Sequence, residues 1–225
     1  MPVKARSAVT WGIAEMSNKA KLELGTGGQW VTTQRMRLGI LGSGSGSNMQ
    51  AILDAIDAGE LDAQIALVLS DNPDAFILER ARCRGIATGV IDCRGFQTRF
   101  PDDAQAETAQ RLQGAGVELI CLAGFLRLVK RPLLDAFPNK IINIHPSLLP
   151  AFPGLRSWQQ ALDAGASETG CTVHRVDDGM DTGPILLQER VPILPGDTAE
   201  SLHARIQIIE HRLYPAAIRL VQAER

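Results

Sequence analysis

The chain has 225 residues, of which 45% are hydrophobic and 21% charged, a composition typical of a folded globular protein and not of a disordered or fibrous one. Its formal net charge of −2 gives no domain-wide positive field, so nucleic acid is not an expected partner. No apolar run reaches the ~18 residues of a membrane span, and the four scattered cysteines are typical of a reducing compartment. We therefore expect a soluble, cytoplasmic protein without a membrane partner.

The first 35 residues carry five basic and two acidic side chains and show no helical or strand period. A second methionine, Met36, immediately precedes the first clean apolar run. We predict that residues 1–35 are a disordered extension or reflect a mis-assigned start, and that residues 36–225 form one domain. A mitochondrial leader is a weaker alternative, because Glu15 and Glu23 interrupt the basic pattern.

From Arg37 onward, short apolar runs alternate with segments of helical period, which is typical of a parallel α/β sheet. Asn72-Pro73 resembles a helix N-cap followed by proline at the first helical position, and Gly59 and Gly85 end the predicted helices before them. The pattern predicts strands at 37–41, 63–69, 119–123 and 140–144, and helices at 48–58, from 72 to 85, and one ending near 113.

Two later apolar runs, 171–176 and 185–191, are joined by a glycine-rich loop too short for a helix, so they are predicted to pair antiparallel. A capping box at 197–200 starts a long amphipathic helix toward Glu224, with a kink expected at Pro215. The predicted fold is a Rossmann-like open α/β sheet, mainly parallel with antiparallel strands at its C-terminal side and helices on both faces.

The turn after the first strand, residues 42–48, consists entirely of Gly, Ser and Asn. Free backbone N–H groups at a helix N-terminus bind phosphate, and glycine lets the ligand approach, so we favour a phosphate site within this turn. A permissive turn with a cap remains an alternative. A dinucleotide-binding site is a second alternative, in which Asp71 would be the acidic residue that binds the ribose. The glycine spacing departs from the G-x-G-x-x-G pattern of such sites, and no lysine completes a P-loop.

Strand alternation places Asn143 and His145 on one face at the carboxyl end of an apolar strand that Pro146 terminates. Ligands of open α/β sheets bind at such ends. An asparagine can hold an oxyanion and a histidine can exchange a proton near neutral pH, although a structural role for both is equally compatible with the local pattern.

The loop 177–183 concentrates three acids, among them Asp181, but it does not match the calcium-loop pattern, so no metal is predicted. A plain polar hairpin loop is the alternative. Glu210 and His211 fall on the last predicted helix, where charged side chains ordinarily face solvent.

Five motifs in order resemble the phosphoribosylglycinamide formyltransferases of the folate-dependent formyltransferase superfamily, over essentially all of residues 36–221. The run His145-Pro-Ser-Leu-Leu-Pro150 marks the wider group, and the glycine-serine turn points to the glycinamide ribonucleotide branch. The motifs are Gly44-Ser-Gly-Ser-Asn48, Leu122-Ala-Gly-Phe125, Asn143-Ile-His-Pro-Ser-Leu-Leu-Pro150, Met180-Asp-Thr-Gly-Pro184 and Glu210-His211.

The resemblance implies that a formyltransferase catalytic domain at 36–225 moves a formyl group from 10-formyltetrahydrofolate, a co-substrate, to the glycine amine of glycinamide ribonucleotide in purine biosynthesis. It implies small-molecule substrates only, no metal, and a monomer or homodimer. Carried over residue by residue, the catalytic residues are Asn143, His145 and Asp181, the phosphate turn is Gly46, Ser47 and Asn48, the substrate contact is Glu210, and the folate contacts are Arg99, Leu126, Arg127, Leu128, Val129 and Asn143.

For the reaction, we expect Asn143 to donate to the oxyanion and Asp181 to raise the pKa of His145 so that its protonated ring can donate too. Relatives that hydrolyse the formyl-folate or act on methionyl-tRNA carry an additional domain that is not expected within this length. A non-catalytic phosphate-binding or nucleotide-binding module is the alternative of a different class, and it predicts ligand binding without any dependence on folate.

Overall fold

The structure is a computed structural model that describes residues 21–24, 30–96 and 99–225. The chain divides into two compact units, Met1–Arg35 and Met36–Arg225. In the first unit, β1 (Lys21–Leu24) pairs antiparallel with β2 (Trp30–Thr33), two strands that the sequence pattern does not predict. The prediction of a disordered extension or mis-assigned start falls mainly on residues outside the described ones and stays a prediction.

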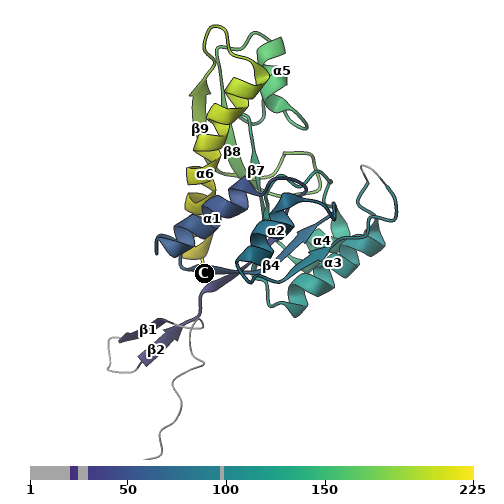
Figure 1. Ribbon diagram of the computed structural model, residues 1–225, viewed down its shortest axis with the longest axis vertical. Helices are drawn as coiled ribbons and strands as arrows, with labels where there is room; N and C mark the ends of the chain where they lie inside the picture. The colour runs from purple at the N-terminus through teal and green to yellow at the C-terminus, as the bar shows by residue number, and fades with distance from the viewer. Residues whose placement is uncertain (1–20, 25–29, 97–98) are drawn as a thin grey trace, which may run out of the picture. The chain divides into compact units, whose positions relative to one another are not determined.

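The second unit contains a seven-stranded sheet in the order β5-β4-β3-β6-β7-β8-β9 (Figure 1). The pairs from β5 through β7 are parallel, whereas β7 with β8 and β8 with β9 are antiparallel, as predicted. The strands are β3 (Met36–Leu41), β4 (Ala63–Ser70), β5 (Thr88–Val90), β6 (Leu119–Leu122), β7 (Ile141–His145), β8 (Glu168–Arg175) and β9 (Ile185–Pro192). The helices are α1 (Ser47–Asp57), α2 (Phe76–Cys83), α3 (Asp102–Gly114), α4 (Arg131–Ala136), α5 (Ser157–Asp163) and α6 (Ala199–Ala223).

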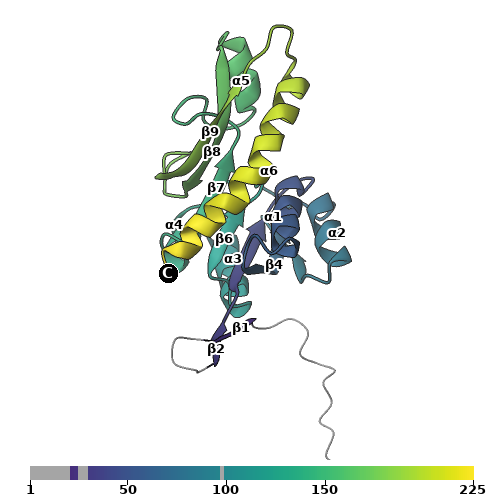
Figure 2. The same cartoon turned by 90° about the vertical axis from the view of Figure 1, so that its left-hand side faces the viewer.

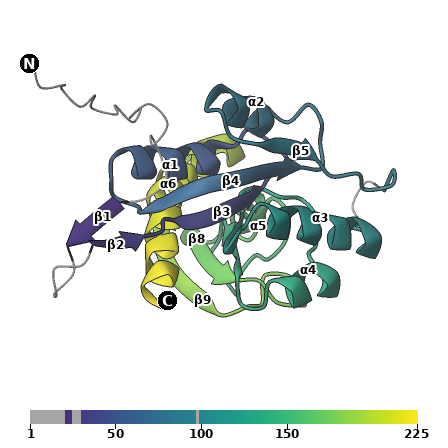
Figure 3. The ribbon, with the colours of Figure 1, turned by 90° about the horizontal axis from the view of Figure 1, so that it is seen from below.

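Helices cover both faces of this sheet, because its central strands are apolar on both sides (Figures 2 and 3). In β6, Leu119 and Cys121 join the core under α1, α2 and α6, while Ile120 and Leu122 join the core under α3 and α4. The Tyr214 hydroxyl of α6 lies 2.8 Å from the carbonyl oxygen of Leu122 and 3.2 Å from that of Ile142, so the last helix is fixed to the two central strands. The predicted fold class is confirmed.

Strand β3 pairs with β4 on one side and β6 on the other, so the chain reverses its direction of travel across the sheet at this strand. At such a switch point the loops after neighbouring parallel strands separate and leave a crevice at their carboxyl ends. The turn 42–46, the loop 71–75 and the loop 123–130 all leave the sheet there. The topology therefore brings together three loops that are far apart in the sequence.

Two predicted helix starts are wrong by a few residues. Asn72 does not cap α2, because its hydrogen bonds close a turn before the helix. Its side-chain oxygen accepts from the Asp74 N–H, and its carbonyl oxygen accepts from the Ala75 N–H. The N-cap position of α2 is Ala75. Thr198, not Asp197, is the N-cap of α6, and it forms a capping box with Ser201. Helix α6 continues through Pro215, and no helix in the described ranges is long and apolar enough to cross a membrane.

Candidate active site

A cavity of about 570 Å³ opens at the carboxyl ends of the parallel strands. Residues from both the N-terminal and the C-terminal parts of the second unit line it. Nearly every residue that the sequence analysis selects lines it, and Arg99 does not. Its walls come from 44–48, 122–129, 143–146, 154–156, Trp158, His174, Val176, Asp177, 179–181 and the α6 residues His203, Gln207 and Glu210.

The N-terminus of α1 faces this cavity and has no side-chain cap. Its first N–H groups, which find no partner within the helix, are therefore directed at whatever occupies the cavity. The N-cap Gly46 has a φ of 74°, and a Cβ there would lie within 2.9 Å of three Ile77 atoms. Glycine is thus needed both for the left-handed backbone and for the close contact with α2.

Asn48 and Glu210 connect α1 to α6 beside that turn. The Asn48 side-chain amide donates to Glu210 Oε2 at 2.9 Å. Glu210 is only 5% exposed and lies in the cavity wall, so the default expectation that a charged helical side chain faces solvent is wrong for it, and the substrate contact that the resemblance implies stays a prediction. Burial raises the pKa of Glu210, and the bond from Asn48 opposes this only in part.

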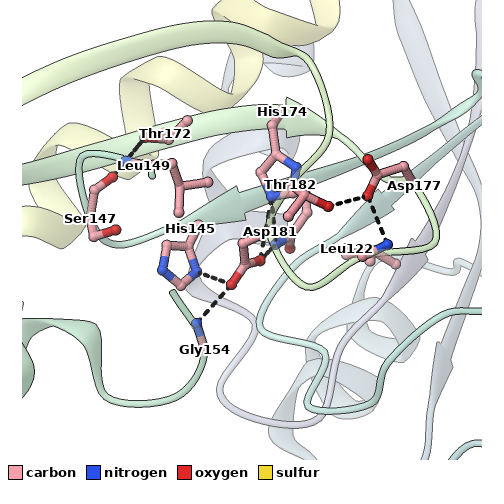
Figure 4. Close-up of polar contacts among 12 residues, drawn as sticks. Leu122, His145, Ser147, Leu149, Gly154, Thr172, His174, Asp177, Asp181 and Thr182 are labelled. Atoms are coloured by element: carbon pink, nitrogen blue, oxygen red, sulfur yellow. Dashed lines mark hydrogen bonds and ion pairs between the residues drawn. The ribbon is translucent and has the colours of Figure 1, made fainter. Parts of the chain in front are cut away.

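The four polar side chains Asn143, His145, His174 and Asp181 form what we call the histidine cluster. Figure 4 shows three of them, with His145 and His174 directed toward Asp181. Strand β7 supplies Asn143 and His145 on one face, and the antiparallel register sets His174 of β8 directly opposite Asn143. Asp181 approaches from the loop between β8 and β9: its Oδ2 lies 3.4 Å from His145 Nδ1, and its Oδ1 lies 3.5 Å from both His174 Nε2 and Asn143 Nδ2.

The three acids of the loop 177–183 have different functions. Asp177 closes the loop on itself by accepting from Gly179 and Thr182, and Asp178 pairs with Arg131 at the surface. Only Asp181 turns inward, with a left-handed φ of 56°, and the Gly154 N–H donates to its Oδ2 at 2.8 Å. Non-glycine residues in this region of φ concentrate at functional sites.

The protonation of the cluster differs from the sequence-based expectation. Burial lowers the pKa of His145, while the Phe152 carbonyl and, as expected, the Asp181 charge raise it by less, so the net shift is downward. Burial raises the pKa of Asp181, but contacts with His174, the Gly154 N–H and His145 outweigh it and hold that pKa below its ordinary value. The unliganded site therefore favours an ionised carboxylate beside a neutral imidazole.

His145 has a fixed ring orientation. Its Nε2 lies 3.0 Å from the Phe152 carbonyl oxygen, which can only accept, so Nε2 carries a hydrogen in either protonation state. Nδ1 faces the Asp181 carboxylate and gains a hydrogen only when the ring is protonated. A proton taken up by His145 would thus be placed between the ring and Asp181.

A second group of polar side chains, Ser43, Asp71 and Arg127, forms what we call the arginine cluster. Ser43 Oγ donates to Asp71 Oδ1 at 2.5 Å, and Arg127 Nε donates to Asp71 Oδ2 at 2.6 Å. Both carboxylate oxygens of Asp71 are therefore engaged within the protein, which argues against the alternative in which it binds a dinucleotide ribose.

Several side-chain and backbone groups of this site were not predicted from the sequence. His174 falls within a predicted strand, whose alternating side chains leave either face possible for it. The register with β7 shows that it faces the site. The Phe152 carbonyl and the Gly154 N–H are backbone groups with no side-chain pattern to reveal them. Arg99 is exposed, and its guanidinium lies 5.3 Å from the Phe96 ring centroid.

The described residues include no group of three or more His, Cys, Asp or Glu side chains arranged to hold a metal ion. The cavity instead combines a helix N-terminus, one buried carboxyl group and an imidazole beside a carboxylate. Such a set can bind an anion, hold an oxyanion and transfer a proton.

Comparison with known proteins places this arrangement among enzymes of one kind. The model of the formyl transferase family matches residues 36–218. A phosphoribosylglycinamide formyltransferase of Escherichia coli (strain K12) is 40% identical over 183 residues, covering 81% of this chain and 85% of that protein. A crystal structure of glycinamide ribonucleotide transformylase 1 from Symbiobacterium toebii has a TM-score of 0.83 and 50% identity, with 89% of this chain and 94% of that one covered.

Longer relatives contain this domain as one part. The trifunctional purine biosynthetic protein adenosine-3 of Drosophila pseudoobscura pseudoobscura is 48% identical over 193 residues, which are 85% of this chain. The chain spans only 14% of the length of that relative.

Proposed function

The chain belongs to the formyl transferase family, and from this premise we propose that it transfers the formyl group of 10-formyltetrahydrofolate to the glycine amine of glycinamide ribonucleotide. The products are N-formylglycinamide ribonucleotide and tetrahydrofolate, in de novo purine biosynthesis. The observation that carries the proposal is that one cavity contains both an uncapped helix N-terminus and the histidine cluster.

In this proposal the ribonucleotide phosphate binds at Gly46, Ser47 and Asn48, where the α1 N–H groups and helix dipole favour an anion. Glu210, held by Asn48 within the same wall, contacts the ribose or glycinamide part. The glycine amine then extends along the cavity toward β7.

The folate is proposed to bind along Leu126, Arg127, Leu128 and Val129. Leu126 is 63% exposed and Leu128 38% exposed in the cavity wall, so both offer apolar surface to a pterin ring. The carbonyl oxygen of Leu126 can accept from its polar edge, and the backbone groups of Leu128 can donate to it and accept from it. The contact of Arg99 with the folate tail remains part of the proposal, at a place outside the cavity wall.

The proposed reaction needs two kinds of help from the protein. The amine nitrogen attacks the formyl carbon, the carbonyl pair moves to oxygen, and collapse breaks the bond to N10, which takes a proton while the amine loses one. Asn143 donates to the oxyanion, and its present contacts of 3.3 Å and 3.5 Å are long enough to be exchanged for a shorter one. His145, paired with Asp181, carries the proton.

Because its pKa is lowered, His145 is proposed to be neutral when the amine attacks and to act first as the base. A neutral imidazole can accept the proton that the attacking amine releases, and the resulting cation is stabilised by Asp181 at 3.4 Å. The proton then returns from Nδ1 to N10, directly or through a water molecule.

The test is an absorbance assay of folate deformylation with purified protein and 10-formyltetrahydrofolate, with and without glycinamide ribonucleotide. Deformylation that depends strictly on the ribonucleotide is the expected result. Deformylation without it would indicate a hydrolase, and none in either case would favour the non-catalytic binding module. The cytoplasmic setting, the monomer or homodimer and the absence of a nucleic-acid partner remain predictions.

A further inference from the structure

The arginine cluster connects three loops that the proposed reaction needs in fixed positions. Ser43 belongs to the glycine-serine turn after β3, Asp71 to the loop after β4, and Arg127 to the segment after β6. These strands are neighbours in the order β4-β3-β6, so their carboxyl ends lie side by side. One carboxylate thus lies between the proposed phosphate turn and the proposed folate segment.

Every connection within the cluster is short. In addition to the two bonds to Asp71, the Leu126 N–H donates to Ser43 Oγ at 3.0 Å. The backbone also links the two loops directly, because the Ser43 N–H donates to the Gly124 carbonyl at 3.1 Å. Arg127 Nη1 donates to the carbonyl oxygens of Phe96 and Arg99 at 2.8 Å and 2.7 Å, which fixes a fourth segment.

The charges of the cluster are buried. The side chains of Asp71 and Arg127 are each only 8% exposed, and the guanidinium is engaged by a carboxylate and two carbonyl groups. A buried ion pair adds little net stability relative to well-packed apolar residues, because both charges must leave water. In some proteins such a pair instead excludes alternative arrangements of the chain.

We propose that Asp71 and Arg127 are positioning residues that hold the phosphate turn and the folate segment in one relative arrangement, so that losing either weakens the binding of both substrates. The inference rests on the proposed function for the identity of those substrates. It assigns the Arg127 side chain to Asp71 and to the carbonyl oxygens of Phe96 and Arg99 rather than to folate. The folate contacts are then left to backbone groups of 126–129 other than the Leu126 N–H, which Ser43 accepts.

The proposal separates positioning from stability through a double variant. Asp71→Ala leaves a buried unpaired guanidinium, and Arg127→Met leaves a buried unpaired carboxylate, so each single variant is expected to lower the melting temperature. Combining the two removes both charges and is expected to recover most of that loss. The connection between the loops is not recovered, so ligand binding should remain weak.

The experiment measures the dissociation constants of two unreactive probes, ribose 5-phosphate and folic acid, by titration calorimetry on the full chain. Asp71→Ala, Arg127→Met and the double variant are expected to raise both constants about tenfold or more. Asp71→Asn retains an acceptor for Ser43, so its two dissociation constants should lie between those of these variants and those of the wild type. Arg205→Met is the matched control, because it breaks the well-formed Asp197 pair outside the cavity and should change stability but neither constant.

Three results would overturn the inference. Unchanged constants in the double variant would show that the pair only supports the fold. A rise for folic acid alone, in Arg127→Met but not in Asp71→Ala, would show that Arg127 contacts folate directly. A rise for one probe alone in all variants would show that the two loops are positioned independently.

Failure of the proposed function has a different outcome. Neither probe reacts, so a chain that binds both but shows no ribonucleotide-dependent deformylation would refute the transferase proposal while leaving the positioning result intact.

Discussion

The two polar clusters of the cavity lie at ends of strands in the same sheet, yet their contacts differ in length. In the arginine cluster the bonds among Ser43, Asp71 and Arg127 measure 2.5 Å and 2.6 Å. In the histidine cluster the side-chain contacts measure 3.3 to 3.5 Å. Catalytic hydrogen bonds are often long before substrate binds and shorten only in the complex. The difference indicates that short bonds fix the loops, while the groups proposed to react keep contacts that a substrate can replace.

The strongest test of this contrast removes groups from the histidine cluster. His145→Ala and Asp181→Asn are each expected to reduce turnover about 10²- to 10⁴-fold, because they remove the proton carrier or its stabilising charge. The dissociation constants of ribose 5-phosphate and folic acid should stay within about threefold of the wild type. Near-normal turnover in either variant would show that these residues are not catalytic.

A second test changes the turn beside the arginine cluster. Gly46→Ala forces a side chain onto a backbone with φ of 74° and against Ile77, so we expect a loss of folding free energy on the order of 1–3 kcal/mol and weaker ribose 5-phosphate binding. Gly44→Ala is the matched control in the same turn, since a Cβ there meets no atom within 4 Å. Denaturant unfolding measures both, and equal losses in the two variants would contradict the assigned cause.

A third test titrates the histidine cluster directly by NMR. The chain has only four histidines, so the ring signals can be assigned by single substitutions. The pKa of His145 is expected to lie below 6.5, and in Asp181→Asn it should fall further, because removing an anion disfavours the imidazolium. A pKa above 6.5 in the unliganded wild type would show that charge, not burial, dominates there.

The smallest expected effect lies outside both clusters. Thr198→Ala removes the N-cap of α6 and should cost about 1 kcal/mol of stability while leaving turnover unchanged. Differential scanning calorimetry and the deformylation assay would measure the two quantities. A large fall in turnover would indicate that the position of α6, which supplies Glu210, is set from its first turn and not by its packing on the sheet.

The sequence predicted the fold well where a single periodicity determined the element. The strand from Leu119 is a continuous apolar run, and such runs are typical of buried parallel strands. Short elements were missed: β5 has three residues and α4 has six, too few to establish a period. The start of α2 was misplaced because Asn72 satisfied a turn in place of the helix.

For the site, sequence motifs selected Asn143, His145 and Asp181, and the structure brings these side chains together. The motifs could not indicate the net pKa of His145, because burial depends on segments such as 152–154 that fold over the ring. Nor could they show that Asp71 and Arg127 meet, since that contact depends on the strand order and not on sequence spacing.

The pairing of β7 with β8 has a consequence for how this domain tolerates insertions and deletions. Asn143 faces His174 and His145 faces Thr172 across one antiparallel ladder, so the spacing of the site is counted in residues along two strands. A one-residue insertion within β8 between Thr172 and His174 would exchange the faces of every following side chain. His174 would leave the site in a single step, without intermediate geometries. The irregularity between Val173 and His174 lies instead in the pairing with β9, so length variation is accommodated on the edge of the sheet away from Asn143 and His145.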